Sequence, residues 1–324
     1  MSTTVPPANS VTTTPVPGAR LSAQVSKPDA QVERGKNLYP NGIDWPVSLW
    51  LISLHVGALF APFTFTMPGL ILALVLHWVT GGLGICLGYH RLFTHASFKT
   101  FRPVRWMLAL IGGLAGEGGV DDWVSIHRAH HAMSDQVGDP HSPRDGKWWS
   151  HMLWIGRARP DRDEFNKRWA PDMSRDPVLS FICRRFLSSH IVFGLLILGG
   201  ATWYGVILGG ATWYGGLQFG ASVTVWAIFV RLCAVLHVTW MVNSVTHMWG
   251  YRNYETTDDS RNNWLVALLG YGEGWHNNHH AYPRMANHGH RWWEFDVTYR
   301  TIRACALVGL FWDVVDYRNQ SEKA

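Results

Sequence analysis

Charged residues are scarce in this chain of 324 residues, because Asp, Glu, Lys and Arg make up only 16% of it. Soluble globular proteins usually carry about 25%. The shortage is concentrated in two stretches without any charged residue, Trp45 to His90 and Phe186 to Val230. A helix needs roughly 20 apolar residues to cross a bilayer, so each stretch suits two spans and a turn. We therefore predict an integral, multi-pass membrane protein, and not a soluble protein with two pairs of buried helices.

The two charge-free stretches predict two helical hairpins. The four spans are expected at about Ser48–Phe65, Leu70–Gly88, Ser189–Tyr204 and Ala221–His247. The segment between the hairpins, Arg91 to Arg185, contains 15 Lys and Arg residues. Because basic loops stay on the cytoplasmic side of a membrane, we expect this segment and both chain termini to face the cytoplasm.

Cysteine pairs are missing as well. The four cysteines are scattered and form no CxxC pair; they are Cys86, Cys183, Cys233 and Cys305. We therefore expect reduced thiols that only contribute to packing. An HExxH motif is also absent, so the general base of a zinc metalloprotease is missing.

The chain has no nucleic-acid-binding motif, although its formal net charge is +5. Within Arg91 to Arg185 the basic residues mix with 11 acidic ones, so anionic lipid head groups explain them better than nucleic acid does. Residues 1–43 are rich in Ser, Thr, Pro and Val, without apolar periodicity and without the apolar core of a secretory signal. This composition predicts a disordered N-terminal tail, followed by a single domain over residues 44–320.

Histidine, in contrast, is abundant, with 17 residues, and eight of them form three clusters. The clusters are HRLFTH at 90–95, HRAHH at 127–131 and HNNHH at 276–280. Residues three and four apart crowd one face of a helix, so the second and third clusters each concentrate their imidazoles. Eight imidazoles exceed the coordination shell of one ion, which indicates at least two. No cysteine lies in a cluster, as structural zinc would commonly require, and redox iron fits best.

A ninth candidate ligand, His247, lies at the end of the last predicted span, with Asn243 four residues before it. Both side chains therefore share one helix face and could look into the metal site. A polar pair at this depth indicates function. The alternative is that the pair forms hydrogen bonds between helices.

Two further sequence patterns predict structural features but no catalytic or binding role. The sequence ILGGATWYG occurs at 197–205 and again at 207–215, a period too short for a solenoid. We interpret it as a duplication that lengthens the turn of the second hairpin. The segment from Val297 to Val315 is amphipathic and predicts either an interfacial helix or ordinary core packing.

The three clusters resemble the histidine boxes of the membrane fatty acid desaturase superfamily, in the Δ9 branch of acyl-CoA and acyl-lipid desaturases. NSVTHMWGYRNY at 243–254 and GEGWHNNHHAYP at 272–283 resemble further segments of that family. The resemblance covers about residues 45–318. It implies an all-α membrane fold, with four transmembrane helices in two hairpins and a cytosolic helical cap that holds a di-iron site.

The resemblance also implies the site residues, with no catalytic residue beyond the metal ligands. Two ferrous ions would be held by His90, His95, His127, His130, His131, His247, His276, His279 and His280. Asn243 would hold a metal-bound water, and Trp123 would line the acyl tunnel. Carboxylates near the boxes are candidates to orient the ligand imidazoles; they are Glu117, Asp122, Asp135, Asp139 and Glu273.

The implied reaction is O2-dependent desaturation of a fatty acyl chain, forming a cis double bond at the Δ9 position, in lipid metabolism. The electron donor would be a separate protein of the ferredoxin or cytochrome b5 type, since no cytochrome b5 signature follows Arg318. Animal acyl-CoA members carry a basic residue where this chain has Ser125, and a basic pair after it that this sequence does not match. These departures favour an acyl lipid over acyl-CoA or another acyl carrier. DPHSP at 139–143 resembles the bacterial and plastid branch.

Two other functions remain open at this stage. A hydroxylase or ketolase of the same superfamily would share the ligands. A membrane metal transporter or sensor would use the histidines without catalysis, but it would need polar residues along its spans, which here are largely apolar. In each enzymatic case the metal site and both termini are expected on the cytoplasmic or stromal side.

Overall fold

The computed structural model describes residues 39–207 and 212–316, which belong to one compact unit. The fold is mostly helical, and four helices are long and apolar enough to cross a membrane. They are Trp45–Phe63, Met67–Thr94, Phe186–Ile207 and Trp213–His247. Residues 1–38 of the predicted N-terminal tail lie outside the described residues.

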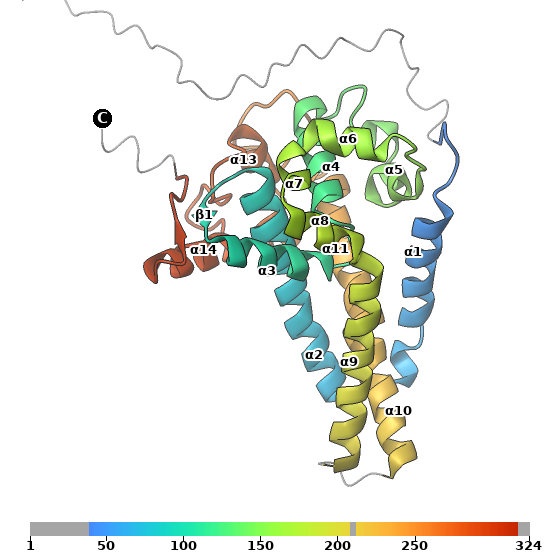
Figure 1. Ribbon diagram of the computed structural model, residues 1–324. Coiled ribbons are helices and arrows are strands. Elements are labelled where there is room, and N and C mark those ends of the chain that lie inside the picture. The colour runs from blue at the N-terminus through green and yellow to red at the C-terminus, as the bar shows by residue number, and fades with distance from the viewer. Residues whose placement is uncertain (1–38, 208–211, 317–324) are drawn as a thin grey trace, which may run out of the picture. The chain divides into compact units, whose positions relative to one another are not determined.

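The long helices contain several regular segments. These are α1 (Trp45–Ala58) with η1 (Ala61–Phe63), α2 (Met67–His77) with η2 (Trp78–Thr94), α9 (Phe186–Ile207), and α10 (Trp213–Thr224) with η5 (Val225–Val230), α11 (Arg231–Ser244) and η6 (Val245–His247). The shorter helices are α3 (Arg102–Gly113), α4 (Val120–Met133), η3 (Pro143–Asp145), α5 (Lys147–His151), η4 (Leu153–Gly156), α6 (Arg162–Trp169), α7 (Pro171–Ser174), α8 (Pro177–Arg184), α12 (Trp264–Leu269), α13 (His276–Ala281) and α14 (Val297–Leu307). Figure 1 shows α4 to α8 and α13 gathered at one end of the long helices.

The long helices extend beyond the predicted spans at most ends. The first begins at Trp45 because Asp44 caps it, accepting a hydrogen bond from the Val47 amide at 3.1 Å. The second continues past Gly88 to Thr94, so the first histidine box begins inside a helix. The distribution of charged residues in the sequence could not predict this end of the helix, because the helix continues through a charged residue, Arg91. Arg91 is fully buried and is paired with carboxylates from the C-terminal part of the chain.

Few of the side chains on the first and third long helices are buried. Only 11% and 17% of their most apolar stretches are buried, and Phe63 is 85% exposed. Exposed apolar surface of this extent is unfavourable in water and is satisfied by lipid. The long helices therefore support a membrane protein.

The segment η2 has the wider turns of a π-helix and is rich in glycine. Gly84 faces Gly112 of α3 so closely that a Cβ on Gly84 would lie 2.7 Å from the Gly112 Cα. The absence of both side chains lets α3 lie directly against η2. This close approach positions the helix that carries the first box.

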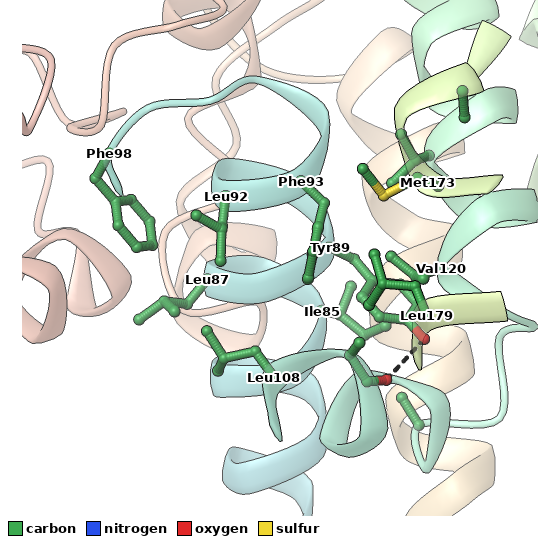
Figure 2. Packing of buried hydrophobic residues seen from close by; sticks show 14 of the residues in the cluster. Ile85, Leu87, Tyr89, Leu92, Phe93, Phe98, Leu108, Val120, Met173 and Leu179 are labelled. Atoms are coloured by element: carbon green, nitrogen blue, oxygen red, sulfur yellow. Dashed lines mark hydrogen bonds between the residues drawn. The ribbon is translucent and has the colours of Figure 1, made fainter. Parts of the chain in front are cut away.

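An apolar cluster supports this contact (Figure 2). Tyr89 and Phe93 of η2 pack in one buried cluster with Leu108 of α3, Met173 of α7 and Leu179 of α8. The hydroxyl of Tyr89 donates to the Ala109 carbonyl at 3.1 Å. The first box is therefore held against the short helices by hydrophobic burial and by a satisfied buried hydroxyl.

Two sequence predictions are wrong in their details. The amphipathic helix expected over 297–315 ends at Leu307, because Gly309 has a φ of +74° and strand β2 (Phe311–Trp312) pairs with β1 (Lys99–Thr100). The first ILGGATWYG copy lies within α9 and not in a turn; residues 208–211 of the second copy lie outside the described residues.

Candidate metal centre

All nine histidines that the sequence singles out come together in two groups. In each group, one ring nitrogen of every member lies within 4.8 Å of the others. The first group is His90, His95, His127, His131 and His279, and the second is His130, His247, His276 and His280. The groups are adjacent, because the rings of His131 and His280 stack with centroids 4.5 Å apart. Each group could hold one metal ion.

Helical spacing explains how the boxes divide between the two groups. On α4, His127 and His131 are four residues apart and enter the first group, whereas His130 turns toward the second. On α13 the pair four residues apart, His276 and His280, enters the second group, and His279 enters the first. Each short helix thus contributes to both groups, which keeps the two positions close together.

The contacts between ring nitrogens do not fit hydrogen bonds alone. The Nε2 atom of His279 lies 3.1 Å from Nε2 of His90 and 2.9 Å from Nε2 of His131. A ring nitrogen carries either one hydrogen or one lone pair, so it cannot bond both neighbours. Moreover, Nε2 of His95 and Nε2 of His130 are buried with no protein partner in the described part of the chain. Inward-facing lone pairs of this kind fit a bound cation.

Carboxylates hold the outer nitrogen of four of these rings. The pairs are His90 with Glu273 at 2.7 Å, His130 with Asp139 at 2.9 Å, His247 with Asp135 at 2.8 Å, and His280 with Asp258 at 2.7 Å. Each Nδ1–H donates to its carboxylate, so Nε2 is left as a lone pair facing inward. This arrangement orients metal-ligating histidines and raises their basicity.

The charge states of these pairs suit metal binding. Burial lowers the pKa of His280 to about 4, although the hydrogen bond to Asp258 acts in the opposite direction. Burial alone would raise the pKa of Asp258, but its hydrogen bond from His280 holds that pKa well below the usual range. At neutral pH the ring is therefore neutral and the carboxylate ionised, as a ligand and its supporting anion require.

Sequence reasoning named three of these four carboxylates. Asp135, Asp139 and Glu273 are near the boxes in the chain, whereas Asp258 lies 22 residues before His280 and gave no signal. The other two carboxylates named beforehand do not contact the ligands. Asp122 pairs with Arg159 and Arg162, and Glu117 accepts hydrogen bonds from Trp123 and Thr239.

Two further buried histidines border the groups and were not predicted. The ring of His288 lies 4.5 Å from that of His279, and its Nδ1 is 3.3 Å from Glu273. The ring of His141 lies 4.3 Å from that of His130. Burial lowers the pKa of His141 to about 3 and that of His288 to about 4, so both rings are neutral. Only the three-dimensional structure places them here, because neither belongs to a box.

A cavity of about 550 Å3 reaches the metal centre. His127, Trp123 and Asn243 line it at that end, so Trp123 lies where the sequence analysis expects a tunnel wall. The lining also includes large apolar side chains, among them Trp50 and Leu51. The volume falls within the range of about 300–1,000 Å3 that is common for small-molecule sites.

Glu117 is an acidic group of this lining that bridges two other wall residues. It accepts from Trp123 Nε1 at 2.8 Å and from Thr239 Oγ1 at 2.7 Å. Burial raises the pKa of Glu117 to about 7, and the two hydrogen bonds only partly offset this. The contacts hold the indole of Trp123 stacked against the ring of His127, with centroids 4.9 Å apart and the ring planes inclined by 28°.

The sequence is similar to those of several known proteins. The fatty acid desaturase family matches residues 62–312. The sn-1 stearoyl-lipid 9-desaturase of Anabaena variabilis is 44% identical over 270 residues, covering 83% of this chain and 92% of that protein. The sn-2 palmitoyl-lipid 9-desaturase of Nostoc sp. (strain 36) is 42% identical, covering 81% and 86%. Delta-9 acyl-lipid desaturase 1 of Arabidopsis thaliana is 37% identical, covering 81% and 80%.

Proposed function

Because the chain belongs to the fatty acid desaturase family, we propose that it introduces a cis double bond at the Δ9 position of a fatty acyl chain. The observation that carries this proposal is the convergence of nine histidines into two adjacent groups beside a partly apolar cavity. The names of its relatives supply the position of the double bond. The protein is thus a fatty acyl desaturase, an oxidoreductase of lipid metabolism.

We propose that each histidine group binds one iron ion. The donor set of neutral imidazoles without cysteine differs from that of structural zinc and suits iron. Asn243 would hold a water on one ion from its place on the cavity wall. Bound iron supplies the activation of O2 that the removal of hydrogen atoms from an unactivated methylene requires.

The protein's own contribution is orientation and the exclusion of water. The four carboxylates fix the ligand tautomers, as described above. Trp123, held by Glu117 against His127, would place one face of its indole along the acyl chain next to the metal centre. The indole is already fixed by its hydrogen bond to Glu117 and its stacking on His127, so it loses little conformational freedom when substrate binds. It can therefore align one methylene pair with the ions.

We propose the substrate and the electron donor on the same basis, membership of the fatty acid desaturase family. The relatives act on lipids by name, and Ser125 supports an acyl lipid over acyl-CoA, because it is fully buried and bonds Asn166 at 2.6 Å. The electrons would come from a separate ferredoxin or cytochrome b5 type protein. The reaction takes up O2, two electrons and two protons, and releases two waters for each double bond formed.

For the membrane arrangement we propose two hairpins under a cytosolic helical cap, with the metal site and both termini on the cytoplasmic or stromal side. The domain would span residues 44–320 after a tail of residues 1–43. Support comes from the close packing of α9 on α10, where a Cβ on Gly205 would lie 3.2 Å from the Gly216 Cα. The basic segment between the hairpins supports the orientation.

The test is a lipid profile from a desaturase-deficient host that expresses this chain. We expect His130→Ala to abolish double-bond formation while the protein stays in the membrane, because His130 is a ligand held by Asp139. His190→Ala is the matched control, since His190 is buried on α9, packs its ring against Trp50, and has one hydrogen-bond partner among the described residues, the Phe186 carbonyl of its own helix. Robust unsaturation by the His130 variant would contradict the proposal, and hydroxylated products would point to a hydroxylase instead.

A further inference from the structure

The cavity has a polar end that the reaction at the metal centre does not explain. Three charged residues in its lining are exposed, namely Arg162, Asp163 and Arg184, so this end opens to solvent. We call it the cavity mouth, and its charged residues are Asp44, Asp121, Asp122, Asp163, Arg157, Arg159, Arg162 and Arg184. An acyl chain needs no charged group along its length. The mouth is therefore suited to the carrier that remains attached to the chain.

The mouth lies at the depth where the first long helix begins. The Asp44 amide donates to the Gly156 carbonyl at 2.8 Å, and Ile43 forms a β-bridge with Arg157. The next residue, Trp45, starts the first membrane-spanning candidate and is 60% exposed. Exposed tryptophan at the end of a span is typical of the lipid head-group level. Arg157 thus lies at the level that lipid head groups would occupy.

Two arginines of the mouth have unused hydrogen-bonding groups. Arg159 and Arg162 both pair with Asp122, yet Nη1 of Arg159 is buried with no partner. Arg157 forms no ion pair in the described part of the chain, and its buried Nε has no partner. Buried guanidinium groups without acceptors are costly, and a phosphate oxygen is the acceptor that fits their fork of donors.

The charge of the mouth limits how many phosphates it can attract. Four arginines face four aspartates, so the side chains of the mouth carry no net positive charge. A carrier with several phosphate charges, such as coenzyme A, would find no excess of positive side chains to balance those charges. A single phosphodiester needs only the unused donors of Arg157 and Arg159. A sugar head group has no anionic oxygen for them.

On the basis of the proposed desaturase function, we propose that the acyl carrier is a glycerophospholipid whose phosphodiester binds Arg157 and Arg159 at the cavity mouth. The glycerol backbone then lies at the level of Trp45, and one acyl chain enters the cavity toward Trp123 and His127. This places the reacting methylenes at a depth set by the distance between the arginines and the metal centre. The same distance, from the arginines to the metal centre, would then determine which methylenes react once the carrier is bound.

The test compares three substrates with the same stearoyl chains, using the iron-loaded enzyme with reduced ferredoxin. They are distearoylphosphatidylglycerol, distearoyl monogalactosyldiacylglycerol and stearoyl-CoA. We expect the phospholipid to have the lowest KM. We expect Arg157→Gln to raise that KM about 10-fold or more with kcat nearly unchanged, because a charged hydrogen bond to the carrier is lost equally in the ground and transition states. Arg157→Lys should recover part of the loss.

The control is Arg175→Gln, an exposed arginine that does not line the cavity. A lower KM for the galactolipid or the coenzyme A ester, or equal KM values for the Arg157 and Arg175 variants, would overturn the proposal. Equilibrium binding of radiolabelled distearoylphosphatidylglycerol to the purified proteins provides a second readout. If no substrate is desaturated, the proposed function fails; the head-group proposal then stands or falls on whether Arg157→Gln weakens binding relative to Arg175→Gln.

Discussion

Single carboxylates decide which nitrogen of four of the proposed ligands faces the candidate metal centre. Asp258 shows how the chain prepares such a group before any ion binds. Its Oδ1 accepts from the Thr256 hydroxyl at 2.9 Å and from the Ser260 amide at 3.0 Å, so Oδ2 is left pointing at His280. Because the carboxylate is already held, little conformational freedom is lost when it orients the imidazole.

At this scale we expect Asp258→Asn to weaken iron binding about 10- to 100-fold, because a neutral amide can turn over and no longer supports the basicity of His280. The measurement is the iron retained by the purified protein against increasing chelator. Asp259→Asn is the matched control, since Asp259 is next in the chain and its carboxylate pairs with Arg144 near the surface. Equal iron retention by the two variants would show that the Asp258 contact does not support the ligand.

At the scale of elements, the metal centre depends on how closely helices pack around η2. The first box begins on this helix. The helix α3 can lie against it because Gly84 and Gly112 have no side chains at the point of contact. The apolar cluster around Tyr89 then fills the space beside this contact. Not every glycine of the membrane helices has such a role, because a Cβ built on Gly199 of α9 has no neighbouring atom within 4 Å.

We expect Gly84→Ala to destabilise the protein by about 1–3 kcal/mol, because the methyl group would meet the backbone of α3 and not a flexible side chain. We also expect it to release iron more readily, since His90 would move with η2. Thermal stability and iron content of the purified protein check this. Gly199→Ala should leave both unchanged or slightly improved, because alanine favours a helix; similar losses in both variants would contradict the packing argument.

At the scale of the molecule, the charge asymmetry that would orient the chain in a membrane coincides with the location of the proposed metal ligands. The segment from Arg91 to Arg185 carries the basic residues and also α4, which contributes three ligands. The connection between α1 and α2 is uncharged and carries none. Positive charge is retained on the cytoplasmic side, so the ligands, the cavity mouth and the electron donor would all be on that side.

We therefore expect cysteines introduced at Lys147 and Phe65 to react from opposite sides of the membrane. In a background with the four native cysteines replaced by serine, an impermeant thiol reagent should label Lys147→Cys only after the cells are opened. Phe65→Cys should be labelled in intact cells. Both residues are exposed, so access is not limited by packing. Labelling of both from the same side would contradict the proposed arrangement.

The sequence by itself determined the features that depend on neighbouring residues. The apolar runs predicted the long helices because crossing a bilayer is a matter of local length and composition. The i, i+3 and i, i+4 spacing of the boxes predicted clustered imidazoles, and three boxes in one chain implied more than one ion. All nine of those histidines lie in the two groups.

Only the tertiary structure decided which distant groups complete the site. Asp258 and His288 meet the ligands through the folding of loops that have no periodicity, so no local pattern could reveal them. The same holds for Arg157, whose position at the cavity mouth comes from a backbone bridge to Ile43, more than 100 residues earlier. Such contacts depend on chain segments brought together by burial, and burial is a property of the whole fold.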